Sequence, residues 1–182
     1  MIKGNAQCQV CKIVTRCIER QPKLMRFTVK SYENGGSIQS YPAIDTTTDD
    51  YKRIFAVADF FAQQGKTVIL TPKFDGGKAC PDYDKIYGSL KGTKYYGKCP
   101  DMSIDGVWYE HEGYAGNNPK SSFRNMLNHG LKQSDRIIVE DCGLTDRYME
   151  RVVFNRNNCS EKIEEVWIHK SGTIILLNKT KG

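Results

Sequence analysis

The sequence predicts a single α/β domain in which helices pack on a central mixed or antiparallel sheet. Short runs rich in β-branched residues alternate with segments whose apolar residues recur at helical spacing. Turn residues separate these segments at short intervals. The length of 182 residues is enough for one domain with a sizeable core and is short for two.

Composition places the chain among ordinary soluble proteins, with 39% hydrophobic and 26% charged residues. No apolar run approaches the roughly eighteen residues that a membrane span requires. The first residues carry no apolar export signal, so we expect a cytoplasmic protein with no membrane partner. We therefore expect the seven cysteines to be reduced thiols. The net charge of +6 favours a polyanionic partner.

We interpret residues 1–48 as an N-terminal extension that forms one structural unit with a domain over residues 49–182. An alternating segment over 24–32 predicts a strand in this extension. Three cysteines before it have the spacing of part of a zinc site: Cys8, Cys11 and Cys17. A structural zinc normally has four ligands. No fourth ligand follows at the usual spacing, so structural zinc is not expected here.

The remaining elements follow in order from apolar periodicity and turn residues. Cap residues and first-turn acids begin a helix over 49–64. A buried strand over 67–71 follows, and Asp105-Gly106 predicts the tight turn of a hairpin over 103–112. Asn118 and Pro119 begin a helix that ends near residue 132. The last predicted elements are a strand over 136–140, a helix over 145–154 and a hairpin over 164–177.

The segment 73–100 predicts a long excursion rich in glycine and lysine, with tyrosines between the lysines. Basic charge beside aromatic faces can hold a phosphate backbone and stack on bases. We therefore expect Lys94 and Lys98 to contact nucleic acid. The alternative is a loop that its lysines keep solvated.

Candidate catalytic residues gather in the stretch from Cys99 to Glu140. Two carboxylates lead into the hairpin, an acid–imidazole–acid triplet ends its second strand, and a basic helix follows. Because side chains alternate along a strand, Glu110 and Glu112 face one way and His111 faces the other. The catalytic set that we expect at one cleft is Asp101, Asp105, Glu110, His111, Lys120 and Gln133.

Two kinds of phosphodiester chemistry fit these residues. In a metal-dependent nuclease, Glu110 with Asp105 or Asp101 would hold Mg²⁺, which activates water and neutralises phosphate charge. In a metal-free ribonuclease, a carboxylate or His111 would remove the proton of a ribose 2′-hydroxyl while a cation supports the developing charge. The second mechanism needs no cofactor, and the residues leave both open.

The helix predicted over 119–132 offers amide and cationic donors that suit phosphate oxygens. The candidate nucleic-acid-binding residues on it are Arg124, Asn125, His129 and Lys132. The alternative is a helix face that is merely solvated.

Several short motifs follow one another in a fixed order over roughly residues 55–178. They are Phe60-Phe61-Ala62-Gln63-Gln64-Gly65, Leu70-Thr71-Pro72, Pro100-Asp101, Asp105-Gly106, Tyr109-Glu110-His111-Glu112, Ser122-x-x-Asn125 and Lys132-Gln133-Ser134-Asp135. This ordered set resembles the C-terminal nuclease domains of contact-dependent inhibition and other polymorphic toxins, and related phage or mobile-element modules.

The resemblance implies a small nuclease that cleaves phosphodiester bonds, in tRNA-like RNA rather than DNA, with a cognate inhibitor protein as a partner. One departure concerns the lysine of a Glu-x-Lys motif, because this chain has Glu110-His111-Glu112. Either His111 or Lys120 substitutes for that lysine, or the site is of the metal-free kind, or activity is lost. The alternative functions are a non-catalytic nucleic-acid-binding or accessory protein of a phage or mobile element, and a zinc-stabilised interaction module.

Overall fold

The computed structural model describes residues 24–114, 116–158 and 162–179. The predicted cluster of Cys8, Cys11 and Cys17 lies outside the described residues.

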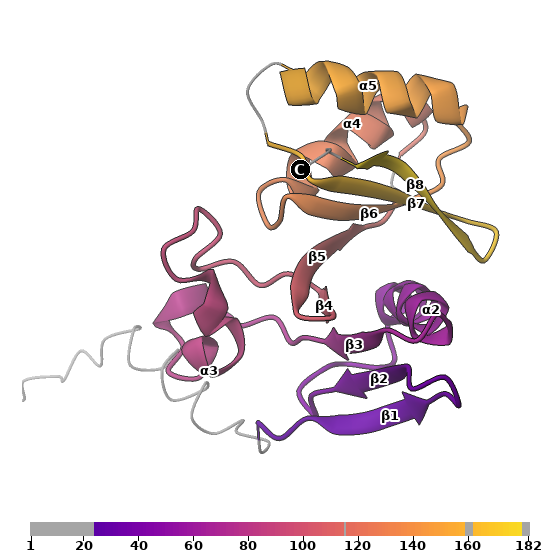
Figure 1. Cartoon of the computed structure of the whole chain (residues 1–182). Helices are drawn as coiled ribbons and strands as arrows, with labels where there is room; N and C mark the ends of the chain where they lie inside the picture. The colour runs from indigo at the N-terminus through magenta and orange to yellow at the C-terminus, as the bar shows by residue number, and fades with distance from the viewer. Residues whose placement is uncertain (1–23, 115, 159–161, 180–182) are drawn as a thin grey trace, which may run out of the picture.

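One eight-stranded sheet runs through the molecule, and strands that are consecutive in the sequence are neighbours in it (Figure 1). The strands are β1 (Phe27–Ser31), β2 (Ser37–Ser40), β3 (Thr67–Leu70), β4 (Met102–Ile104), β5 (Val107–Glu112), β6 (Arg136–Glu140), β7 (Glu165–Lys170) and β8 (Thr173–Lys179). Parallel pairing joins β2 to β3, β5 to β6 and β6 to β7. Because β4 is antiparallel to both β3 and β5, those two strands point in the same direction. The five strands β2, β3, β5, β6 and β7 are therefore all parallel to one another. The mixed sheet confirms the predicted α/β fold class.

Three helices connect the parallel strands and cover both faces of the sheet (Figure 1). They are α2 (Asp49–Gln63) between β2 and β3, α4 (Pro119–Gly130) between β5 and β6, and α5 (Asp146–Asn158) between β6 and β7. Val57 and Phe61 of α2 pack on one face, whereas α4 and α5 pack on the other. None of the helices in the described part of the chain combines the length and the apolar character needed to cross a membrane.

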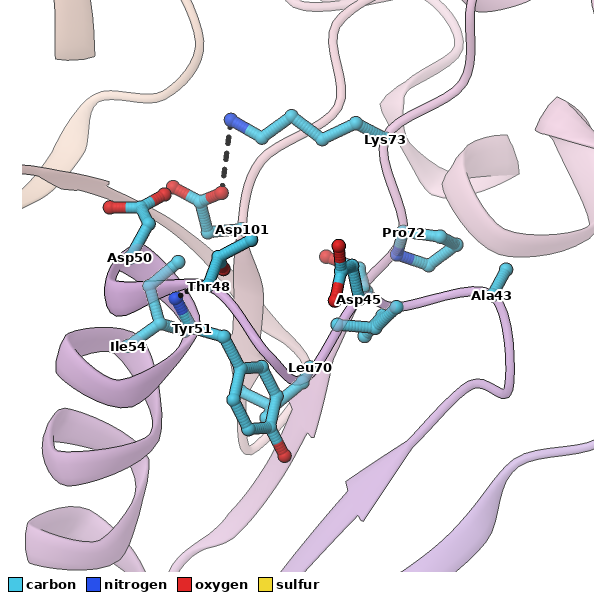
Figure 2. A pocket seen from close by; sticks show the side chains of 12 residues that line it. Ala43, Asp45, Thr48, Asp50, Tyr51, Ile54, Leu70, Pro72, Lys73 and Asp101 are labelled. Carbon is cyan, nitrogen blue, oxygen red and sulfur yellow. Dashed lines mark hydrogen bonds and ion pairs between the residues drawn. The ribbon is translucent and has the colours of Figure 1, made fainter.

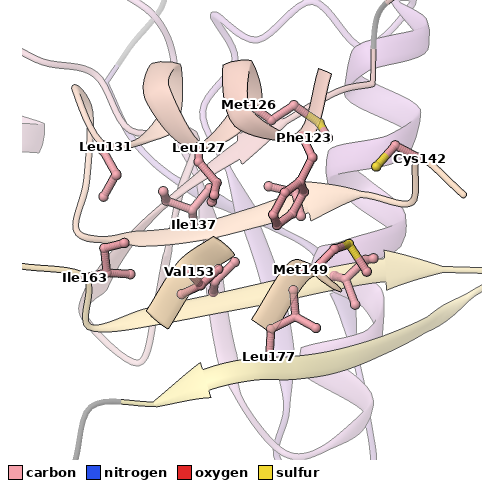
Figure 3. Packing of buried hydrophobic residues seen from close by; sticks show 13 residues of the cluster. Phe123, Met126, Leu127, Leu131, Ile137, Cys142, Met149, Val153, Ile163 and Leu177 are labelled. Atoms are coloured by element: carbon pink, nitrogen blue, oxygen red, sulfur yellow. The ribbon is translucent and has the colours of Figure 1, made fainter. Parts of the chain in front are cut away.

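Side-chain alternation along β6 determines which residues meet which helices. Ile137 and Val139 belong to the core under α4 and α5, whereas Ile138 belongs to the core under α2. Figure 3 shows Leu127 and Phe123 of α4 above Ile137 in the first of these cores. Fully burying one such aliphatic side chain contributes about 1.5–3 kcal/mol. The strand β6 is therefore anchored on both faces.

Local sequence signals fix the ends of the main elements. Thr48 Oγ1 accepts a hydrogen bond from the Tyr51 amide at 3.0 Å and caps α2. Asn118 caps α4 in the same way, directly before the proline at its first position. Asp105 and Gly106 have φ of 48° and 82°, which gives the tight hairpin turn that the dipeptide predicts.

Two strands come from the described part of the predicted N-terminal extension. The strand expected over 24–32 is β1, and β2 follows it as an addition that the sequence did not predict. The strand β1 pairs with β2, and β2 pairs in parallel with β3. Both β1 and β2 therefore belong to the same sheet as the strands that follow residue 48.

The segment 73–100 is more ordered than the sequence predicts. It contains α3 (Tyr83–Tyr87) between two short 3-10 helices, η1 (Gly77–Ala79) and η2 (Gly88–Leu90). Tyr83 and Tyr87 are fully buried and stack with their centroids 5.0 Å apart. The prediction of an aromatic surface for bases is therefore wrong for these tyrosines, because their rings fill a small core of their own.

Candidate active site

The parallel strands end at one side of the sheet, and three of the acidic residues singled out by the sequence lie there: Asp101, Glu110 and Glu112. Ligands of open α/β sheets bind outside the carboxyl ends of the strands. Lys73 follows β3 after Thr71 and Pro72, and Asp101 directly precedes β4. Because Met102 pairs with Tyr109, the next residues outward, Asp101 and Glu110, lie opposite each other.

An ammonium group joins two buried carboxylates at this edge. Lys73 Nζ lies 3.0 Å from Asp101 Oδ1 and 3.5 Å from Glu110 Oε1. The residues Asp101 and Glu110 are only 5% and 3% exposed, whereas the lysine side chain is 60% exposed. The His111 amide donates to Asp101 Oδ2 at 3.0 Å and fixes the second oxygen of that carboxylate. The carboxylates of the cluster are thus buried, whereas its ammonium group is open to solvent.

Burial and like charge shift the protonation of the two glutamates. Burial, followed by the negative charge of Asp101, raises the pKa of Glu110 well above its usual value. The same two causes raise the pKa of Glu112 to about 7, although the charge of Lys73 opposes them. Burial lowers the pKa of Lys73, but attraction to Asp101 and Glu110 outweighs it and raises that pKa overall. Lys73 therefore stays protonated and partly offsets the acidic charge.

One oxygen of this cluster is left without a partner. Glu110 Oε2 is buried and makes no hydrogen bond to any described residue. An unsatisfied buried acceptor costs roughly 1–3 kcal/mol, and more when it is charged. A cation or a proton at Glu110 would remove this cost.

The two carboxylates fit a divalent cation of the magnesium type. No group of three or more His, Cys, Asp or Glu side chains in the described ranges is arranged to hold a metal ion. Mg²⁺ is commonly bound through one or two carboxylates, with water and substrate phosphate completing its shell. Asp101 and Glu110, with the unpartnered Oε2 atom, are a donor set of that kind.

Asp105 does not join this cluster, and its predicted pairing with Glu110 around a metal is wrong. Its carboxylate lies 2.8 Å from Lys66 Nζ and accepts from the Thr67 amide at 2.9 Å. Asp105 is in the hairpin turn, five residues before Glu110, or on the order of 15 Å away along the strand. It stabilises the start of β3 and the turn.

The imidazole of His111 lies on the other face of the sheet, as strand alternation predicts. His111 Nε2 is 2.8 Å from Glu140 Oε1, and His169 Nδ1 is 2.9 Å from the same oxygen. Burial raises the pKa of Glu140, but the hydrogen bonds from both histidines outweigh it and lower that pKa overall. The expectation that this imidazole converges with the carboxylates is therefore wrong, and only the His111 amide reaches the cluster.

No hydrogen bond or ion pair joins Lys120 or Gln133 to the cluster in the described part of the chain. Lys120 Nζ is 5.5 Å from the centre of the Tyr148 ring, in a cation–π contact with α5. Gln133 follows α4 beside Ser134, whose hydroxyl donates to the Trp108 carbonyl at 2.9 Å. Its buried Oε1 has no hydrogen-bond partner in the described structure. Of the six predicted catalytic residues, the structure brings together Asp101 and Glu110.

The cluster gains Lys73, which sequence reasoning missed as a site residue. The sequence feature that could have identified it is its position directly after Leu70-Thr71-Pro72, the motif that ends a predicted strand. The candidate nucleic-acid-binding residues are all exposed: Lys94, Lys98, Arg124, Asn125, His129 and Lys132. Arg124 donates to the Tyr148 hydroxyl at 3.4 Å, so its guanidinium is partly engaged.

A pocket of about 280 Å³ adjoins the cluster on the side of α2. Lys73 and Asp101 form part of its wall, and Figure 2 shows the contact between them at one end of the pocket. The loop between β2 and α2, the first turns of α2 and the end of β3 with the two residues after it provide the rest. An opening therefore connects directly with the charged groups.

Comparison with protein-family models, curated proteins and solved structures found no significant match.

Proposed function

We propose that this chain is a small nuclease whose active site is built from Asp101, Glu110, Glu112 and Lys73. The observation that carries the proposal is the position of the Lys73 ammonium between two buried carboxylates at the carboxyl-terminal ends of the parallel strands. Phosphodiester cleavage requires stabilisation of negative charge on the phosphate and a group that activates the nucleophile. The cluster offers both kinds of group.

Lys73 supplies the cation that the Glu110-His111-Glu112 sequence lacks. The lysine expected two residues after the glutamate is replaced by one from the end of β3, whose Nζ reaches the same carboxylates. Neither His111 nor Lys120 is needed in that role. With Lys73 in this role, the proposed chemistry does not depend on the missing motif lysine.

Asp101 and Glu110 would hold Mg²⁺, which supplies charge stabilisation and activation of water when it is bound. Asp101 is already oriented by the His111 amide, so one ligand is fixed in advance. Glu112, with its pKa raised to about 7 by burial and by the charge of Asp101, is suited to proton transfer near neutral pH. Lys73 would neutralise charge on the phosphate oxygens.

RNA is the favoured substrate, and a toxin role with a cognate inhibitor protein is part of the proposal. Both rest on the resemblance of the ordered motifs. The net charge of +6 and the exposed donors of α4 suit a polyanionic substrate. Because α4 follows the carboxyl-terminal end of β5, its N-terminus lies at the same end of the strands as the carboxylates.

The experiment is cleavage of total RNA and of plasmid DNA, each with Mg²⁺ and with EDTA, by the parent and by Glu110→Gln. We expect Mg²⁺-dependent cleavage of RNA and a loss of about 100- to 10,000-fold in rate for the variant. Glu150→Gln is the matched control, because Glu150 is an exposed residue of α5. Lys94→Ala should only weaken binding. Thermal melts of each variant would establish that it is folded.

An unchanged rate for Glu110→Gln would reject the proposed site. Nucleic-acid binding by the parent without cleavage under any metal condition would favour the non-catalytic accessory protein instead.

A further inference from the structure

Three cationic side chains of α4 and α5 gather around Tyr148. Lys120 Nζ lies 5.5 Å from the centre of the Tyr148 ring, and the guanidinium carbon of Arg151 lies 5.6 Å from the same point. The Arg124 guanidinium donates to the Tyr148 hydroxyl at 3.4 Å. Because an aromatic ring attracts cations placed over its face, one tyrosine holds positive groups of two helices together. We call Lys120, Arg124, Tyr148 and Arg151 the cationic surface.

The charges of the cationic surface are open to a ligand. Lys120, Arg124 and Arg151 are exposed, and the tyrosine between them is half-buried. None of the three cations forms an ion pair with a carboxylate of a described residue. Like charges that gather without a counter-charge repel one another, so an anion bound among them relieves that repulsion. Guanidinium and ammonium groups are the donors that phosphate oxygens accept from most strongly.

The cationic surface and the proposed catalytic glutamates lie on the same face of the sheet. Glu110 and Glu112 are in register with Ile137 and Val139 of β6, so all four side chains point to one face. Ile137 and Val139 belong to the core beneath α4 and α5. The glutamates therefore lie on the face that carries these two helices.

The same groups also share one end of the strands. The helix α4 follows the carboxyl-terminal end of β5, and α5 follows that of β6. Lys120 and Tyr148 are in the first turns of their helices, and Arg124 and Arg151 are in the second turns. A strand whose scissile phosphate lies at Lys73 therefore meets the cationic surface without crossing to the other face of the sheet.

We propose that the cationic surface binds the phosphate backbone of the substrate strand on one side of the scissile bond. Contacts to phosphates fix the position of a strand and carry no sequence information, so this surface aligns the substrate without selecting a base. The inference rests on the proposed nuclease function, because it takes the carboxylate cluster as the place of cleavage. It adds Tyr148 and Arg151 of α5 to the binding residues expected on α4.

The test is binding of a single-stranded RNA of about 20 nucleotides to the whole protein, measured by fluorescence anisotropy in EDTA from about 50 to 200 mM salt. Each phosphate contact on a single strand contributes about 0.7 to the slope of log affinity against log salt. The double variant Arg124→Gln with Arg151→Gln should bind more weakly and reduce that slope by about 1.4. Arg124→Lys with Arg151→Lys keeps both charges and should retain most of the slope.

The matched control is the double variant Lys66→Gln with Lys162→Gln, which removes the same charge at the other end of the parallel strands. Lys66 directly precedes β3, and Lys162 lies shortly before β7. Each lysine pairs with a carboxylate, Lys66 with Asp105 and Lys162 with Glu164. This control should change the slope by less than about 0.3. Thermal melts would establish that both double variants are folded.

An unchanged slope in the arginine-to-glutamine variant, or an equal loss in the lysine control, would overturn the inference. Polyglutamate of equal charge tests the alternative of an acidic protein partner. We expect the parent to bind it more weakly than RNA, and equal or tighter binding would also overturn the inference.

Cleavage with Mg²⁺ provides a second measurement. Contacts that are equal in the ground state and the transition state affect KM and leave kcat unchanged, so the arginine-to-glutamine variant should raise KM alone. Binding in EDTA is measured without cleavage, so the two proposals fail separately. Cleavage by a parent whose RNA binding does not depend on the two arginines would refute the surface alone. Weakened binding in the variant, with no cleavage by the parent, would refute the nuclease alone.

Discussion

Replacing Glu112 by glutamine is expected to stabilise the protein above pH 7 and to have little effect below pH 4.5. Burial and the charge of Asp101 raise the pKa of Glu112 from 4.5 to about 7. A carboxyl whose pKa is raised on folding contributes its full share of stability below the unfolded pKa. That share is lost as the pH rises through the folded pKa. The variant has no carboxyl to ionise and avoids the loss.

The size of the effect follows from the shift. A change from 4.5 to about 7 corresponds to roughly 3 kcal/mol at about 1.4 kcal/mol per pKa unit. Glu112 is half-buried, so solvent screening reduces this value. We expect the variant to gain about 1–2 kcal/mol in its free energy of unfolding at pH 8.

Urea denaturation of the parent and of Glu112→Gln at pH 4.5 and pH 8, in EDTA, measures this difference. Glu150→Gln, which changes an exposed carboxylate on α5, is the control and should show no such pH dependence. A Glu112→Gln effect of the same size at both pH values would refute the account of the cluster's electrostatics.

Two further predictions concern packing and the histidine pair. Gly130→Ala would place a Cβ 2.8 Å from the buried Ile137 Cγ2, so urea denaturation should show a loss of about 1–3 kcal/mol. A single variant as stable as the parent would contradict the close contact. His169→Phe leaves Glu140 with His111 as its partner. It should cost about 1–3 kcal/mol at pH 7 by the same assay, and an unchanged midpoint would contradict a structural role for the pair.

Much of the fold was predictable because its signals are local. The caps Thr48 and Asn118 and the turn at Asp105 each act within a few residues. The strand β2 was missed because its sequence, Ser-Ile-Gln-Ser, holds one apolar residue. It becomes a strand because β1 and β3 pair with it on both sides, and that pairing depends on contacts distant in sequence.

The candidate site was predictable where its residues share one hairpin. Asp101 and Glu110 are brought opposite each other by the pairing of β4 with β5. Lys73 was not predictable, because its place depends on Leu70 pairing with Met102 across a separation of thirty-odd residues. Asp105 was assigned to the site by closeness in sequence, although a strand carries it to the far end of the hairpin.

The opposite orientation of His111 and its neighbours followed from strand alternation alone, and the structure confirms it. Its partner Glu140 comes from β6, and His169, which contacts the same carboxylate oxygen, comes from β7. No local pattern links these strands to β5, so the histidine pair became visible only when the sheet order was known.

The position of Lys73 between Asp101 and Glu110 is the central claim, and single-turnover RNA cleavage by Lys73→Met tests it most directly. The matched control is Lys78→Met, which removes an exposed lysine of η1 whose ammonium lies over the Tyr96 ring. We predict a loss of about 100-fold or more for Lys73→Met with Mg²⁺ present, and less than about threefold for Lys78→Met. Equal rates for the two folded variants would contradict the account.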